Sequence, residues 1–200
     1  MIKNNVLIGK DGWLFLYSGS QNQFSFLKGE KKIDAISVDN FLSNIHSRRE
    51  YCRRKSIDFC HIVFPSKPVV KIKYLPHEHN DIKSLFRSYF QKRLDSDSGV
   101  FYPFEELEKL DENHSSFHKY NTHNSDRGYL EIVKFIFSKL DYEICFEDFI
   151  EGFDKRMVGG DLANMISLSS LVEEDFVILK KNKKVYRVGN RKYLQGNTGD

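Results

Sequence analysis

The 200-residue sequence has few of the features that directly assign a chain to a class of protein. It contains three cysteines, four prolines and one tryptophan, and no repeat or low-complexity tract. It also lacks any apolar run near the roughly 20 residues that a membrane-spanning helix needs. The N-terminal residues carry no apolar segment of the kind that marks a secretory signal peptide. We therefore expect no membrane span and no export signal.

The sequence also has no large excess of positive or negative charge. Lys and Arg total 31 and Asp and Glu total 28, which gives a net charge of +3. Proteins that bind nucleic acid or membrane surfaces through their overall field carry a larger excess. The sequence shows no zinc-finger spacing and no RNA-binding signature either. We expect no nucleic-acid partner, and the oligomeric state stays undetermined.

The three cysteines, Cys52, Cys60 and Cys145, are odd in number and lie in apolar or helical patterns. Such a set is typical of reduced core residues rather than of a disulfide framework. Together with the missing export signal, it predicts a cytoplasmic location.

Apolar residues make up 40% of the chain and include 17 Phe, enough for the core of one domain spanning 1–200. Helical periodicity covers 38–55, 81–94, 103–110 and 126–140, and strand-like runs lie at 57–64, 100–102 and 142–146. Hairpins are expected at about 5–17 and about 176–188. This alternation predicts an α/β fold, a three-layer sandwich with a mainly parallel sheet.

The segment 119–129 is where we expect chemistry to lie. His123 precedes a helical pattern that Ser125 or Asp126 can cap. A histidine in such a loop can face a cleft and act as a general base, because its proton moves near neutral pH. From spacing alone, an ordinary loop histidine is the more frequent outcome.

Three other candidates have simpler explanations. Lys67 follows the predicted strand 57–64, where it is either a ligand for an acidic substrate group or, as we favour, an exposed turn lysine. His77 and His79 form a His-x-His pair without a third ligand at a useful spacing, so we expect no metal. Asp161 is expected to cap a short helix rather than to take part in catalysis.

Four stretches, taken in order, resemble the AlgX/AlgJ-type SGNH hydrolase-like proteins, which are O-acetyltransferases of exopolysaccharide biosynthesis. The matching stretches are Gly9-Lys10-Asp11-Gly12-Trp13-Leu14-Phe15, Phe64-Pro65-Ser66-Lys67 with Tyr74-Leu75-Pro76, Lys119-Tyr120-Asn121-Thr122-His123-Asn124-Ser125-x-x-Gly128-Tyr129, and Gly160-Asp161-Leu162-Ala163-Asn164-Met165. The third resembles the family's Asp-x-His-Trp-Asn-x-x-Gly box. The first is interpreted as a hairpin, joined by the Asp-Gly turn signal and anchored by Trp13.

The resemblance implies an SGNH-type fold and an O-acetyltransferase or acetyl esterase that acts in exopolysaccharide, alginate or capsule biosynthesis in bacteria. Its partners would be a polysaccharide or sugar precursor and an acetyl donor, with no cofactor. It implies that His123 is the general base, and it places the family in the periplasm, an alternative to the cytoplasm. A catalytically inactive glycan-binding or scaffolding relative is the other function that we consider.

The sequence departs from the family in its catalytic set. Asn121 stands where the family has the Asp that orients the histidine, and Asn124 stands where it has Trp. No Gly-Asp-Ser or Gly-Thr-Ser block with a nucleophilic serine follows residue 170, and Ser167, Ser169 and Ser170 do not lie on a Gly-flanked elbow. We expect a chain truncated before its nucleophile or a branch that lost it, and no efficient hydrolysis by these 200 residues.

Overall fold

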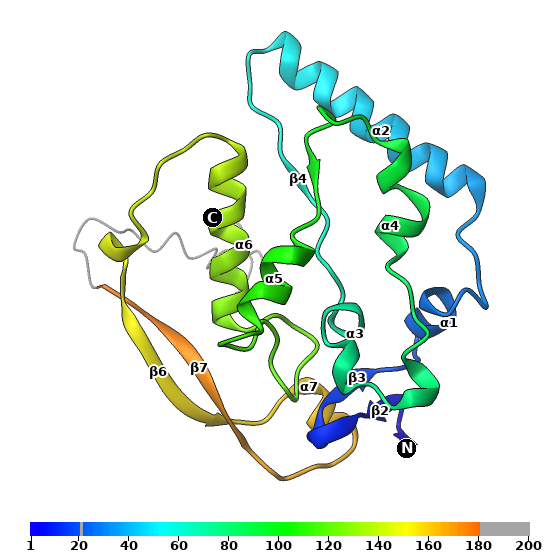
Figure 1. The fold of residues 1–200 in the computed structure, drawn as a ribbon, viewed down its shortest axis with the longest axis vertical. Coiled ribbons are helices and arrows are strands. Elements are labelled where there is room, and N and C mark those ends of the chain that lie inside the picture. Colours follow the sequence, from blue (N-terminus) through cyan, green and yellow to red (C-terminus); the bar gives the residue numbers. More distant parts are fainter. Residues whose placement is uncertain (21, 181–200) are drawn as a thin grey trace, which may run out of the picture.

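The computed structural model describes residues 1–20 and 22–180. Its helices are α1 (Gln23–Leu27), α2 (Ala35–Arg54), α3 (Lys67–Val70), α4 (Leu85–Tyr89), α5 (Phe104–Leu110), α6 (Asp126–Lys139) and α7 (Asp161–Met165) (Figure 1). Its strands are β1 (Ile2–Lys3), β2 (Val6–Ile8), β3 (Leu14–Leu16), β4 (His61–Ile62), β5 (Val100–Phe101), β6 (Ile150–Val158) and β7 (Val172–Leu179). Short 3-10 turns include η2 (Ile72–Tyr74), η3 (His77–His79) and η5 (Phe146–Asp148).

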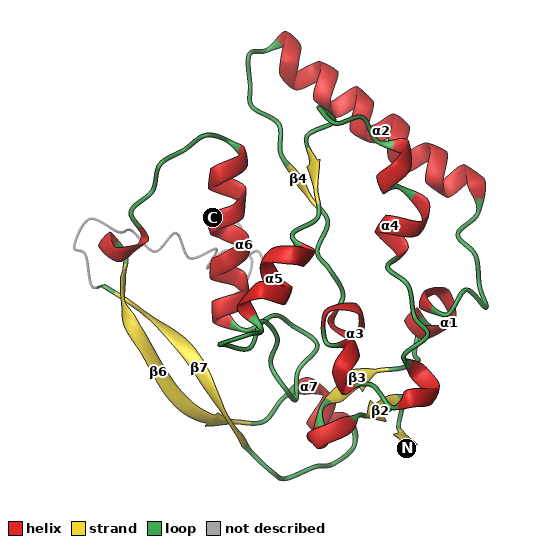
Figure 2. Ribbon diagram, in the orientation of Figure 1, coloured by secondary structure: helices red, strands yellow, loops and turns green. Residues whose placement is uncertain are grey.

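The middle of the fold is the short parallel pair of β4 and β5, with helices on both sides (Figures 1 and 2). On one side, Phe41 of α2 packs against His61 of β4, with ring centroids 5.8 Å apart. On the other side, Phe101 of β5 packs against Phe135 of α6 at 6.0 Å. The predicted α/β class is confirmed.

The predicted mainly parallel sheet is not confirmed in the described part of the chain. There the strands form three small sheets, and β4–β5 is their only parallel pair. The expected strand at 57–64 shortens to two residues, and its ends are open to solvent, with Ile57 54% and Phe64 52% exposed. A strand buried on both faces needs neighbours along its whole length, and these residues lack them.

The N-terminal strands β2 and β3 pair antiparallel within the predicted 5–17 hairpin, with Val6 opposite Leu16 and Ile8 opposite Leu14. Their connection needs left-handed backbone at Asp11 and Gly12, where φ is 52° and 74°. Asp and Gly are the residues that reach this region most easily, so the turn follows directly from the local sequence.

The two faces of this hairpin belong to different cores. Leu7 and Phe15 face the larger cluster, which also contains Phe24, Leu75, Leu107 and Ile132. Val6 and Leu14 face a smaller cluster made with Leu162, Ala163 and Ile166 of the α7 region. Because side chains alternate along a strand, the hairpin joins α7 to the rest of the protein.

The C-terminal part differs from the predictions. Strands β6 and β7 form a long antiparallel ribbon, from Ile150 opposite Leu179 to Val158 opposite Val172. The first strand of the hairpin predicted at about 176–188 therefore lies in β7 and pairs with β6, whereas its second strand lies outside the described residues. The strand predicted at 142–146 is wrong: the chain is irregular there and enters η5 at Phe146. Asp141, with φ 56°, turns the backbone out of α6 before this segment.

Cysteine placement needs one correction. Cys52 and Cys60 are partly buried, but Cys145 is exposed and is therefore not a core residue. All three are free thiols.

None of the helices in the described ranges combines the length and the apolar character needed to cross a membrane.

Candidate functional site

His123 lies in a short closed loop, residues 115–125, which we call the His123 loop. Phe117 and Asn124 form an antiparallel bridge at its base. The loop ends at α6, where the Ser125 hydroxyl accepts a hydrogen bond from the backbone N–H of Gly128 at 3.1 Å. This is the N-cap that the sequence predicts. A Cβ at Gly128 would lie 2.1 Å from the carbonyl oxygen of Ser116, so only glycine fits here.

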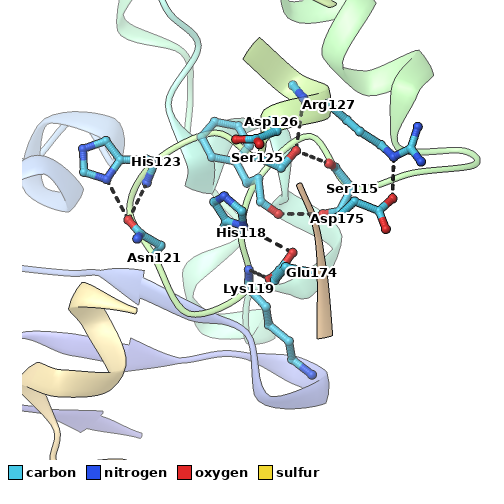
Figure 3. A network of polar contacts seen from close by, with 12 residues as sticks. Ser115, His118, Lys119, Asn121, His123, Ser125, Asp126, Arg127, Glu174 and Asp175 are labelled. Carbon is cyan, nitrogen blue, oxygen red and sulfur yellow. Dashed lines mark hydrogen bonds and ion pairs between the residues drawn. The ribbon is translucent and has the colours of Figure 1, made fainter. Parts of the chain in front are cut away.

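Asn121 holds the imidazole of His123 (Figure 3). The Asn121 side-chain oxygen lies 2.7 Å from Nδ1 of the ring and 3.1 Å from the backbone nitrogen of His123. The backbone N–H can only donate, which identifies the facing amide atom as oxygen. Nδ1 must then donate to the same oxygen, so in the neutral ring the lone pair that can accept a proton lies on Nε2.

Asp161 holds the other side of the loop. Its carboxylate accepts hydrogen bonds from the backbone N–H of Thr122 at 2.9 Å and from the Thr122 hydroxyl at 2.5 Å. Gly160 occupies the N-cap position of α7 and Asp161 is its first helical residue, but the Asp161 carboxylate also accepts a hydrogen bond from the backbone N–H of Leu162 at 2.8 Å, so it has the predicted capping role as well. A Cβ at Gly160 would lie 2.0 Å from the carbonyl oxygen of Tyr120, so the Gly-Asp pair is fitted against the His123 loop.

Lys67 lies beneath the same loop. Its side chain is buried, and Nζ donates to the carbonyl oxygens of Leu14 at 2.7 Å, Asn121 at 2.8 Å and Lys119 at 3.0 Å. The favoured interpretation as an exposed turn lysine is wrong. The alternative as a ligand for an acidic group is not supported, since all three N–H bonds of the ammonium are used. Burial lowers the pKa of Lys67 to about 7, against the opposing effect of the Asp161 and Glu174 charges.

Lys71, one turn further along the chain, holds the start of the loop. Its Nζ lies 2.6 Å from Asp111 and 3.0 Å from the Ser115 hydroxyl. Burial lowers the pKa of Lys71, and the hydrogen bond to Asp111 opposes this shift. Sequence reasoning missed this pair. The available signal was the spacing of four between Lys67 and Lys71, which places two lysines on one face of an otherwise apolar turn.

The aromatic pair Trp13 and Tyr74 completes this support. The two rings stack with centroids 4.6 Å apart, and the ammonium groups of Lys67 and Lys71 lie 5.2 Å and 4.7 Å from the Trp13 ring. A Cβ at Gly9 would lie 2.5 Å from the carbonyl oxygen of Tyr74. The predicted anchoring role of Trp13 is confirmed. All four sequence stretches that resemble the family therefore meet in one place.

Strand β7 contacts the outer side of the loop (Figure 3). Glu174 accepts a hydrogen bond from the backbone N–H of Lys119 at 2.7 Å, and its second oxygen lies 3.3 Å from Nδ1 of His118. Arg127 pairs with Asp175 of the same strand. These polar contacts attach the β6–β7 ribbon to the loop that carries His123.

His123 and Thr122 border a cleft with a volume of about 640 Å³. Across it lie Phe64 and Tyr129, which remain 52% and 41% exposed and whose rings meet edge to face at 6.5 Å. Ser66, at the start of α3, also borders the cleft. Ser167, Ser169 and Ser170 are not among the residues that line it.

The other histidines singled out by sequence have separate environments. His79 packs its ring against those of Tyr17 and Phe24, and burial lowers its pKa. His77 is exposed. Over the ranges 1–20 and 22–180, the structure has no group of three or more His, Cys, Asp or Glu side chains that could hold a metal ion.

No protein-family model matches the chain, and no curated protein matches it. Among solved structures, it is similar to the O-acetyltransferase domain of Pseudomonas putida AlgJ, with a TM-score of 0.51 and 15% identity. It is also similar to Bacillus cereus PatB1, with a TM-score of 0.52 and 15% identity, and to PatB1 with a sulfonyl adduct, with 0.51 and 16%.

Each match covers 88% of this chain, but only 65% of the AlgJ chain and 58% and 57% of the two PatB1 chains. The chain thus spans less than two thirds of the length of the structures that it resembles. Sequence identities this low show the fold alone. The fold is of the AlgX/AlgJ type, as the four sequence stretches predict.

Proposed function

We propose that this chain is an O-acetyltransferase-related domain, or an acetyl esterase, that acts in the biosynthesis of an exopolysaccharide or capsule. His123 is the general base and Asn121 orients it. The observation that carries the proposal is the 2.7 Å hydrogen bond from Nδ1 of His123 to Asn121, which leaves Nε2 free beside the cleft. Support comes from the fold shared with the O-acetyltransferase domain of AlgJ.

In this proposal, Nε2 of His123 takes the proton of an attacking hydroxyl group as its oxygen bonds to the acetyl carbonyl carbon. The resulting imidazolium then returns the proton to the leaving group as the bond to the donor breaks. The hydroxyl belongs either to a serine side chain or to the sugar. The substrates are an acetyl donor and a polysaccharide or its precursor.

Asn121 limits the rate. A neutral amide can orient an imidazole, but it cannot stabilise the imidazolium by charge, and the corresponding Asp-to-Asn change lowers the rate of one serine protease by about four orders of magnitude. A carboxylate, that of Asp161, binds the Thr122 hydroxyl at 2.5 Å, and this hydroxyl oxygen lies 3.3 Å from Nδ1 of His123. The Thr122 hydroxyl therefore lies between the negative charge of Asp161 and the imidazole ring of His123.

The finer architecture is part of the proposal. We infer one SGNH-type domain over 1–200, in which β4 and β5 belong to the central parallel sheet of a three-layer sandwich. The helices on both sides of this pair support that arrangement. The periplasm, by resemblance, and the cytoplasm, by the free cysteines, remain the two locations proposed.

The second candidate function is a non-catalytic relative that binds a glycan or supports an assembly. Two observations favour it. The orienting group Asn121 is neutral, and the cleft exposes the aromatic pair Phe64 and Tyr129, which offers flat apolar surface beside polar groups.

The test compares the wild-type protein with His123→Ala, Asn121→Asp and the control His114→Ala in acetyl transfer from an activated acetyl ester. We expect slow turnover, a loss of at least roughly 100-fold in His123→Ala, a gain in Asn121→Asp, and no change in His114→Ala, whose exposed side chain lies outside the cleft. If neither the wild type nor Asn121→Asp transfers acetyl groups, but both bind a glycan, the second function is correct.

A further inference from the structure

Lys67 is a buried cation that the chemistry proposed above does not use. Its side chain is 4% exposed, and its ammonium group contacts only backbone carbonyl oxygens as acceptors. We propose that Lys67 is a positioning residue of the site: its ammonium group holds the backbone of Asn121 against β3 and so fixes the hydrogen bond that orients His123. This inference rests on the proposed role of His123.

The three hydrogen bonds connect two distant segments of the chain. One goes to Leu14 in β3, and the other two go to Lys119 and Asn121 in the His123 loop, at 2.7, 3.0 and 2.8 Å. Asn121 is also the residue whose side-chain oxygen binds the ring. A shift of the Asn121 backbone would therefore move the group that selects the imidazole tautomer.

The loop is held from two directions. Lys67 binds the carbonyl oxygen of Asn121 from beneath, while Asp161 of α7 binds the N–H and hydroxyl of Thr122. His123 follows directly after these two residues. Catalytic groups must be held within about 0.5 Å of their working geometry by such supporting contacts. The last two residues before His123 are each fixed by a buried or half-buried ionisable side chain.

The residues around Lys67 give no reason to think that its ammonium group stabilises the fold. Trp13 and Phe15 enclose the ammonium group, with ring centroids 5.2 and 5.4 Å from Nζ. Among the residues that the structure describes, no carboxylate is hydrogen-bonded to it, although Asp161 and Glu174 act on it at longer range and Lys71 opposes them. Burying a cation without a paired anion is unfavourable, so an apolar side chain would serve the core better.

The test compares two lysine variants that remove different hydrogen bonds. Lys67→Met removes the hydrogen bonds to the loop. Lys3→Met is the control, because it also removes a lysine-to-carbonyl hydrogen bond between distant segments, that of Lys3 to Ile166 at 2.9 Å, which does not involve the His123 loop. Asn121→Ala removes the oxygen that binds the ring. Nitrogen-15 NMR of His123, recorded over a pH series, gives the ratio of the two neutral tautomers in each folded variant.

We expect the Nδ1–H tautomer to dominate in the wild type and in Lys3→Met. In Lys67→Met and in Asn121→Ala, its ratio to the Nε2–H tautomer should fall roughly fivefold, the factor that corresponds to one lost hydrogen bond of about 1 kcal/mol. A wild-type ratio in Lys67→Met, alongside a reduced ratio in Asn121→Ala, overturns the role of Lys67 but leaves the His123–Asn121 pair intact. An unchanged ratio in Asn121→Ala overturns the pair itself.

A second measurement on the wild type covers the case in which Lys67→Met does not fold. Below pH 7, where Lys67 carries its third proton, the ammonium hydrogens should exchange slowly with water and show nuclear Overhauser contacts to Leu14 and Asn121. Rapid exchange without these contacts overturns the proposal. Neither readout depends on acetyl transfer, so inactivity of the chain does not affect the result.

Discussion

The His123 loop is held at its start and in its middle by two buried lysines in different ways. At the start of the loop, Lys71 pairs with the carboxylate of Asp111 at 2.6 Å, and both side chains are almost fully buried. In the middle of the loop, Lys67 donates to the carbonyl oxygens of Lys119 and Asn121, and to that of Leu14 in β3, and within residues 1–20 and 22–180 no carboxylate is hydrogen-bonded to it. The first lysine is neutralised locally, whereas the second is not. The comparison suggests that the start of the loop is built for stability and its middle for positioning.

The largest effect is expected at the start of the loop. Asp111→Ala leaves the ammonium group of Lys71 buried without its carboxylate and should lower the free energy of unfolding by about 3–5 kcal/mol. Urea unfolding measures this loss. The control Glu173→Ala breaks the pair of Lys155 and Glu173, whose side chains are 66% and 55% exposed, and should lower stability by less than about 1 kcal/mol. Equal losses in both variants would show that the buried pair does not hold the loop.

A smaller effect is expected from substitution of Gly160, which packs against Tyr120 in the middle of the loop. A Cβ at Gly160 would lie 2.0 Å from the carbonyl oxygen of Tyr120, so Gly160→Ala should destabilise by about 1–3 kcal/mol and shift the amide resonances of residues 120–123. Gly152→Ala is the control, since no described residue beyond its two chain neighbours places an atom within 4 Å of the added Cβ. Its stability should change by about 0.5 kcal/mol or less. Unchanged resonances in Gly160→Ala would mean that α7 moves and the loop does not.

A third effect concerns pH and tests the protonation of Lys67. Burial lowers the pKa of Lys67 to about 7 in the folded protein, whereas in the unfolded chain Lys67 stays protonated until pH nears 10.5. Above pH 7 the unfolded state therefore binds more protons at this residue, and stability should rise with pH. The gain is at most about 1.4 kcal/mol per pH unit.

The measurement is the stability of the wild type minus that of Lys67→Met between pH 6 and 9. The difference should be flat below pH 7 and should move in favour of the wild type above it. Because the groups that act on Lys67, namely Asp161, Glu174 and Lys71, are present in both proteins, their own titration largely cancels. A difference that is flat over the whole range would show that Lys67 keeps its proton.

Much of the local structure could be predicted from the sequence. The Asp11-Gly12 turn, the helical stripe of α6 and the Ser125 cap all depend on residues next to one another in the chain. The order of the four motif stretches also predicts the AlgX/AlgJ-type fold that the solved structures share. The placement of His123 in a loop before a helix depends on the same local signals.

The errors lie where burial decides the outcome. The apolar run at 57–64 has the composition of a buried strand, but Ile57 and Phe64 are more than half exposed, because the described part of the chain packs no element over them. Cys145 lies in an apolar pattern and is nevertheless exposed. A sequence pattern shows which residues can be buried, but it does not show whether another segment is present to bury them.

By itself, the sequence determined the turns, caps and helical stripes of this protein, and the residue types available to the site. Only the tertiary structure decided that Lys67 is buried and that Asp161 holds the His123 loop. The partners of Lys67 lie 52–54 residues away along the chain, and Thr122 lies 39 residues from Asp161. Backbone preferences act between neighbours in sequence, whereas the environment of a charge depends on which distant segments fold around it.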